Sequence, residues 1–90
     1  MSTTDKRFAF WGGDIVRLLQ DHPHLQLKAG DQGYVWGVYD LEPPMYEADF
    51  YSQDSSGCAM MFKEHEVERV SDPHDVRIPQ DVIEFWRLAF

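Results

Sequence analysis

Apolar and polar residues alternate along much of the chain, and this pattern predicts five short strands followed by one helix. In residues 14–19, Val16 and Leu18 fall on one face, as they would in a half-buried strand. We predict strands at residues 14–19, 34–39, 46–51, 58–62 and 67–70.

The two central strand segments carry the most informative patterns. In residues 46–51, Tyr46, Ala48 and Phe50 share one face, while Glu47, Asp49 and Tyr51 share the other. We therefore expect the third strand to have one buried and one wet face. Gly37 interrupts the second strand and indicates a bulge or a close backbone approach. Residues 58–62 carry no polar side chain that would face water, so we expect both faces of the fourth strand to be covered.

The last eleven residues predict a helix that begins after Pro79. Val82, Phe85, Trp86 and Ala89 recur at helical spacing, and Ile83 and Phe90 form a neighbouring stripe. One interpretation is that this helix docks over the outer face of the fourth strand, with Phe8, Phe10 or Trp11 filling the edges. The other is that part of the helix, especially Trp86 and Phe90, packs against a second copy or a different protein. The two interpretations are compatible, and packing against a second copy would make the chain a homodimer through its C-terminal helix.

Length and composition allow one domain. Ninety residues with 43% hydrophobic content enclose one modest core. We expect residues 14–70 to form the β domain, 71–79 a linker and 80–90 the helix. The single cysteine, the polar start and the lack of a long apolar run indicate a cytoplasmic chain without a membrane span.

The fold class that follows is mainly β, a small five-stranded SH3-like barrel with a C-terminal helix packed on it. A long loop after the first strand and the Gly30-Asp31-Gln32-Gly33 turn into the second are typical of such barrels. The segments 14–19, 27–33 and 46–50, Val38-Tyr39 and the closing Val67-Glu68-Arg69-Val70 resemble an uncharacterised bacterial family, the domain of unknown function 4926 type. The resemblance implies an SH3-like barrel in a bacterial cytoplasm and implies no activity, cofactor or functional residue.

The net charge of the chain limits the kinds of partner that we expect it to bind. Sixteen acidic against eight basic residues give a formal net charge of -8, which repels nucleic acid and anionic lipid headgroups. We therefore expect a protein partner, and neither nucleic acid nor a membrane. The alternative is that the charge keeps the chain soluble and has no further role.

Two surfaces are candidates for binding that partner. The first combines aromatic and acidic residues in or beside the second and third strands, and the second is the apolar side of the helix. In SH3-like domains an aromatic groove receives extended proline-rich segments while acidic groups hold Arg or Lys. The alternative is that several of these aromatic side chains belong to the core. The predicted partner-binding residues are Trp36, Tyr39, Asp40, Glu42, Tyr46, Glu47, Asp49, Tyr51, Trp86 and Phe90.

The sequence gives little support for a metal-binding or catalytic site. His22 and His24 would need a third ligand such as Asp21, His65 or His74 to hold a metal, and solvated loop histidines are the simpler interpretation. Cys58 begins an apolar strand with no basic neighbour that would activate a thiol. No phosphate-binding loop, dinucleotide motif or zinc-protease motif occurs. We expect no cofactor and no enzymatic activity.

The leading hypothesis is a non-enzymatic interaction module, either an adaptor or a regulatory subunit. The alternative is a small antitoxin-like or immunity-like protein whose acidity masks a basic enzyme. A third class, an enzyme or metal protein, would be revived by stoichiometric zinc or iron in the purified chain.

Overall fold

A computed structural model describes residues 7–52 and 56–89 of the chain. Five strands precede a single α-helix among these residues, as the alternation predicted. The elements are β1 (Ile15–Leu18), β2 (Gln32–Tyr39), β3 (Met45–Tyr51), β4 (Ser56–Lys63), β5 (Val67–Arg69) and α1 (Gln80–Ala89). Three short 3-10 turns lie between them: η1 (Pro23–Leu25), η2 (Glu64–Glu66) and η3 (Pro73–Asp75).

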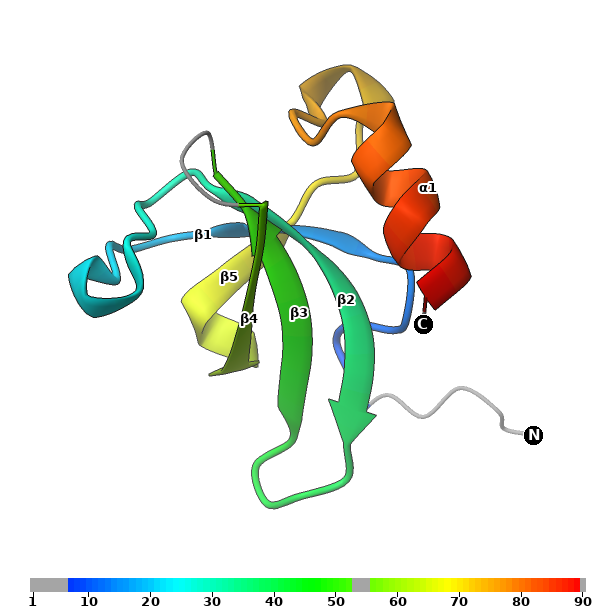
Figure 1. Cartoon of the computed structure of the whole chain (residues 1–90). Coiled ribbons are helices and arrows are strands. Elements are labelled where there is room, and N and C mark those ends of the chain that lie inside the picture. The colour runs from blue at the N-terminus through cyan, green and yellow to red at the C-terminus, as the bar shows by residue number, and fades with distance from the viewer. Residues whose placement is uncertain (1–6, 53–55, 90) are drawn as a thin grey trace.

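The strands form one antiparallel sheet in the order β4-β3-β2-β1-β5. The sheet is strongly curved, and β1 and β5 lie behind β2, β3 and β4 in Figure 1. β4 and β5 remain its two edges, so the sheet is open and does not close into a barrel. The mainly β class and the terminal helix are therefore confirmed, while closure is not found.

The curvature has a local cause in β2. The register between β2 and β3 shifts between Val35 and Gly37, which places the predicted bulge at Trp36. Gly33 lies so close to the ring of Phe50 that a Cβ there would be 2.7 Å from Cδ1. The absence of a side chain at Gly33 thus lets the sheet fold tightly over Phe50.

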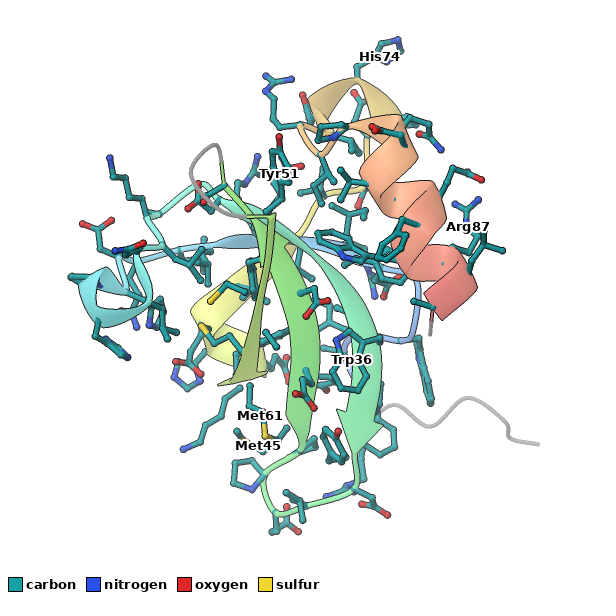
Figure 2. All side chains as sticks on the ribbon, in the orientation of Figure 1. Trp36, Met45, Tyr51, Met61, His74 and Arg87 are labelled. Carbon is teal, nitrogen blue, oxygen red and sulfur yellow. The ribbon has the colours of Figure 1, made fainter. Side chains whose placement is uncertain are left out.

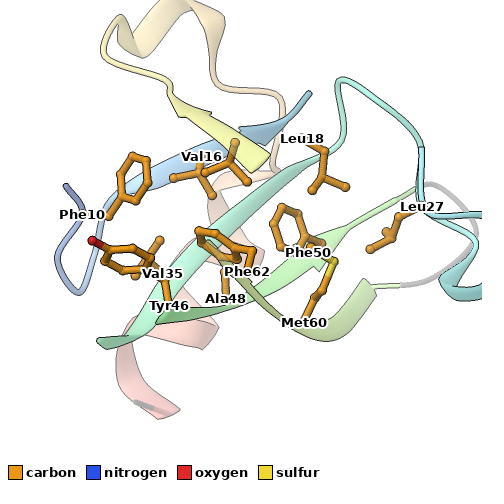
Figure 3. Close-up of a cluster of buried hydrophobic side chains, with 11 residues drawn as sticks. Phe10, Val16, Leu18, Leu27, Val35, Tyr46, Ala48, Phe50, Met60 and Phe62 are labelled. Carbon is orange, nitrogen blue, oxygen red and sulfur yellow. The ribbon is translucent and has the colours of Figure 1, made fainter. Parts of the chain in front are cut away.

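The main core fills the concave side of the sheet (Figure 3). β3 follows its predicted alternation, with Tyr46, Ala48 and Phe50 fully buried. The ring of Tyr46 stacks on Phe62 of β4 with centroids 5.7 Å apart, and Phe10 meets Tyr46 edge-on at 5.2 Å. Each such side chain contributes about 1.5–3 kcal/mol when removed from water.

The segment before β1 belongs to this core and extends the packed region beyond the predicted 14–70. The backbone N–H of Ala9 donates a hydrogen bond of 2.8 Å to the hydroxyl of Tyr46, and Arg69 donates one of 2.5 Å to the carbonyl of Ala9. The same guanidinium lies 5.6 Å from the centroid of the Phe10 ring. Phe10 is therefore held inside the sheet and does not fill an edge beneath the helix.

Helix α1 docks on β2, not on β4. Trp86 is 4% exposed and lies 6.3 Å from Tyr34 between ring centroids, in a second cluster with Ile78 and Ile83 on the convex side of the sheet. The predicted docking on the fourth strand is wrong, because the buried side of α1 packs against Tyr34 of β2 in this cluster. As a consequence only one face of β4 is covered: Met60 and Phe62 are buried, whereas Ala59 and Met61 are exposed.

The predicted linker is fixed by a buried polar side chain. Nε2 of Gln32 donates to the carbonyl of Asp75 at 2.8 Å, and its Oε1 accepts a hydrogen bond of 2.7 Å from the backbone N–H of Arg77. Both ends of the amide are satisfied, which a buried polar group requires. These bonds place Ile78 in the second cluster and so set where α1 begins.

The outward side of α1 is apolar in part. Phe85 is 68% and Leu88 is 88% exposed, although Phe85 was predicted on the same helix face as the buried Trp86. Docking through Ile83 and Trp86 turns these positions to the outside. None of the helices within residues 7–52 and 56–89 has the length and apolar character that crossing a membrane requires.

Candidate functional site

The docking of α1 at one end leaves the rest of the convex sheet face uncovered. We call this region the acidic aromatic face; it comprises Trp36, Tyr39, Met45, Glu47, Asp49, Ala59 and Met61. In the register, Glu47 lies between Gly37 and Met61, and Asp49 lies between Tyr34 and Ala59. Figure 2 shows Trp36, Met45 and Met61 on the side of β2, β3 and β4 turned toward the viewer.

Tyr39 and Glu47 are joined across the β2–β3 pair. The Tyr39 hydroxyl donates a hydrogen bond of 2.7 Å to Oε1 of Glu47. Gly37 makes room for it, because a Cβ at Gly37 would lie 3.1 Å from the Tyr39 hydroxyl oxygen and 3.2 Å from Cβ of Glu47. This hydrogen bond, followed by burial and the negative charge of Glu47, raises the pKa of Tyr39 above its ordinary value.

Asp49 occupies a partly desolvated position beside Trp36. Burial raises the pKa of the Asp49 carboxyl, and the charge of Glu47 two residues away raises it further. A hydrogen bond with Trp36 acts in the opposite direction by favouring the ionised form. The net shift is upward, so the environment of Asp49 disfavours its negative charge.

Neither carboxylate is neutralised within the described part of the chain. The ion pairs found there join other groups: Arg7 with Asp40 and Glu42, Arg17 with Glu68, Arg69 with Asp14, His74 with Asp72, and Arg87 with Glu84. Lys63 lies opposite Met45 at the end of the face, and it also forms no ion pair among the described residues. The face is therefore negative and flanked by aromatic rings.

The structure brings together four of the predicted partner-binding residues, namely Trp36, Tyr39, Glu47 and Asp49. It corrects two others. Tyr46 is 0% exposed because it lies on the concave side of β3, and Trp86 is buried because it anchors α1 on Tyr34. Neither side chain is available at the surface.

Three other predicted residues, Asp40, Glu42 and Tyr51, are described by the structure and are not members of the acidic aromatic face. Asp40 and Glu42 are exposed in the β2–β3 loop, where Arg7 binds both. Tyr51 is half-buried in the cluster beneath α1. Phe90 lies outside the described residues.

Three members of the face were not predicted: Met45, Ala59 and Met61. The available signal was the two-residue alternation of β4, which separates Ala59 and Met61 from Met60 and Phe62. That signal was overridden by the expectation that the helix would cover the fourth strand.

The residues considered for a metal-binding or catalytic site do not come together in the structure. The rings of His22 and His24 meet edge-on with centroids 6.3 Å apart, while His65 lies in η2 and His74 in η3. Across the two described segments, no group of three His, Cys, Asp or Glu side chains is arranged to hold a metal ion. Cys58 is half-buried, with Sγ 3.9 Å from the carbonyl oxygen of Leu25.

Comparisons with family models, with curated proteins and with solved structures find no match to this chain.

Proposed function

We propose that the chain is a non-enzymatic protein-interaction module whose acidic aromatic face binds an arginine or lysine side chain of a partner protein. The observation that carries the proposal is the arrangement on β3. Glu47 and Asp49 occupy successive outward positions, with Tyr39 and Trp36 on β2 beside them, and none of the ion pairs in the described residues includes either carboxylate.

A cation suits this arrangement for two physical reasons. Ionised carboxylates bind cationic donors through hydrogen bonds about twice as strong as neutral ones. Aromatic rings attract a cation placed over their faces by about 0.5–2 kcal/mol, depending on desolvation. The raised pKa of Asp49 adds a third reason, because a neighbouring positive charge would relieve the unfavourable negative charge there.

The net charge of -8 supports a basic partner as a whole. Long-range attraction would speed association, and it would weaken as salt screens the charges. The same face would serve an adaptor, or a neutralising subunit that covers a basic active site. Loss of the partner's activity on binding is the property that separates the second class from the first.

The fold proposed for this module is that of an SH3-like barrel of the domain of unknown function 4926 type, left open between β4 and β5. Three features support it: the strand order β4-β3-β2-β1-β5, the long excursion between β1 and β2, and the 3-10 turn η2 between β4 and β5. Such barrels bind extended peptides on exposed aromatic surfaces.

Selection from a displayed library of random peptides tests the proposed function. We expect the selected peptides to be enriched in Arg and Lys and to bind more weakly as salt is added. In calorimetric titrations, the double variant Glu47→Gln, Asp49→Asn should weaken binding at least tenfold. Asp81→Asn, an exposed carboxylate on α1, is the control for loss of net charge and should change affinity little.

Two results would contradict the proposed function. One is selection of peptides without Arg or Lys. The other is equal affinity of the double variant and the Asp81→Asn control for the selected peptides.

A further inference from the structure

The free edge of β4 presents unpaired backbone groups beside the acidic aromatic face. The backbone N–H of Lys63 donates a hydrogen bond of 2.6 Å to Oε1 of Glu66, so it points away from β3. In an antiparallel ladder the direction of the backbone groups alternates every residue. The N–H and C=O groups of Met61 and Ala59 therefore point to the same free side, and both residues are exposed.

Apart from Lys63 at its end, this edge lacks the usual protection against added strands. Natural proteins block edge strands with charged residues, proline, or a covering loop or helix. Residues 56–62 contain no charge and no proline, and in the described chain β4 pairs with β3 alone. α1, which could have covered β4, lies over β2 instead.

The side chain that lies between the free edge of β4 and Asp49 is that of Ala59, which is small. Asp49 lies directly opposite Ala59, whereas Glu47 lies opposite Met61. Strands are spaced about 4.8 Å apart, so a strand added to β4 would be about 9.6 Å from β3. A long side chain on the added strand could cross Ala59 toward Asp49, whereas Met61 blocks the parallel path to Glu47.

We propose that the edge of β4 binds an extended segment of the partner as a sixth strand, with an arginine or lysine of that segment lying across Ala59 to reach Asp49. This inference rests on the proposed function and states how the cation arrives. Charge identifies the occupant, because the carboxylates beside the edge attract a cationic segment. A second copy of this chain fits less well: pairing two β4 edges in one continuous sheet would place both acidic faces on the same side.

The probe is the tightest-binding arginine peptide from the library selection, compared with its citrulline analogue, which is neutral and nearly the same shape. Ala59→Pro removes the N–H that points away from β3 and leaves the β3–β4 ladder intact. We expect it to weaken binding of the arginine peptide at least tenfold. Ala59→Ser, which keeps a small side chain and the N–H, is the matched control and should bind as the wild type does.

A third variant tests the path of the arginine side chain across Ala59 separately from the backbone hydrogen bonds to β4. Ala59→Leu keeps the N–H but fills the space in front of Asp49. We expect it to bind the arginine and citrulline peptides equally, whereas the wild type prefers arginine. Thermal unfolding of each variant verifies that it is folded.

A measurement on the wild-type chain covers the case in which Ala59→Pro does not fold. Two versions of the arginine peptide carry N-methyl groups on alternate backbone amides, one on the odd and one on the even positions. Only the version whose methylated amides would pair with β4 should fail to bind. The inference is overturned if both methylated peptides and Ala59→Pro bind normally while Asp49→Asn abolishes binding; the proposed function would survive that result. It is also overturned if the wild type is a dimer that Ala59→Pro converts to a monomer, since a second copy would then occupy the edge.

Discussion

The hydroxyl of Tyr39 on β2 and the carboxylate of Glu47 on β3 are joined by a hydrogen bond of 2.7 Å, over the space left by Gly37. The bond ties an aromatic ring to the acidic aromatic face and orients both groups. It also holds the proton on Tyr39, because loss of that proton would place two negative charges together.

Replacing Glu47 by Gln should lower the pKa of Tyr39 toward its ordinary value of 10.0. Tyr39 favours its neutral form more in the folded than in the unfolded chain. Its contribution to stability is therefore present below pH 10 and is lost as pH rises through the raised pKa. Titration of the Tyr39 ring carbon signal by NMR measures the pKa, and Glu42→Gln is the control. An unchanged pKa in Glu47→Gln would show that the bond is not formed in solution.

Replacing Asp49 by Asn should stabilise the chain more at pH 7 than at pH 3. Because the folded pKa of Asp49 is raised, its stabilising contribution is complete below the unfolded value of 3.8 and is lost as pH rises through the folded pKa. Asparagine does not ionise, so the variant loses no stability at this position as the pH rises. Urea unfolding of both proteins at the two pH values gives the comparison, and a larger stabilisation at pH 3 would contradict it.

Replacing Gly33 by Ala should destabilise the fold by about 1–3 kcal/mol, the usual cost of forcing an extra group into a packed core. The new Cβ would lie 2.7 Å from Cδ1 of Phe50, a ring that is fully buried. Gly12→Ala is the matched control, since no heavy atom outside its chain neighbours lies within 4 Å of its Cβ position. Denaturant unfolding would refute this account if both variants lost the same free energy.

Replacing Trp86 by Ala should cost about 3–5 kcal/mol, whereas Leu88→Ala should change the free energy of unfolding by less than about 0.5 kcal/mol. Trp86 fills the contact between α1 and Tyr34, while Leu88 is exposed. Thermal or chemical unfolding distinguishes them. A large loss for Leu88→Ala would mean that the outward side of α1 is covered in solution, as the predicted helix-mediated homodimer requires.

Local sequence patterns were sufficient to predict the strands, the helix and the buried face of β3. The alternation of Tyr46, Ala48 and Phe50 predicted which face of β3 is buried, and Gly37 predicted the bulge beside Trp36. These features depend on the two-residue period of a strand and on the backbone freedom of glycine, which are properties of a few neighbouring residues.

The candidate site was predicted only in part. Glu47 and Asp49 were placed correctly on the outward face, and Trp36 and Tyr39 lie beside them. Tyr46 was assigned to the binding surface although the alternation placed it on one face with Ala48 and Phe50. Its buried hydroxyl accepts a hydrogen bond from Ala9, a residue that is distant in sequence. Asp40 and Glu42 lie in the β2–β3 loop, where Arg7 from a segment outside the strands forms ion pairs with both.

The sequence by itself determined the five strands, the terminal helix, the acidic charge and the wet face of β3, because each depends on residue type and short spacing. Only the tertiary structure decided that α1 lies over β2 and that the edge of β4 stays open. The physical reason is that a helix docks through side-chain contacts that exist only once distant parts of the chain are assembled. Here Trp86 of α1 packs against Tyr34 of β2 beside Ile78, three residues that no local pattern connects.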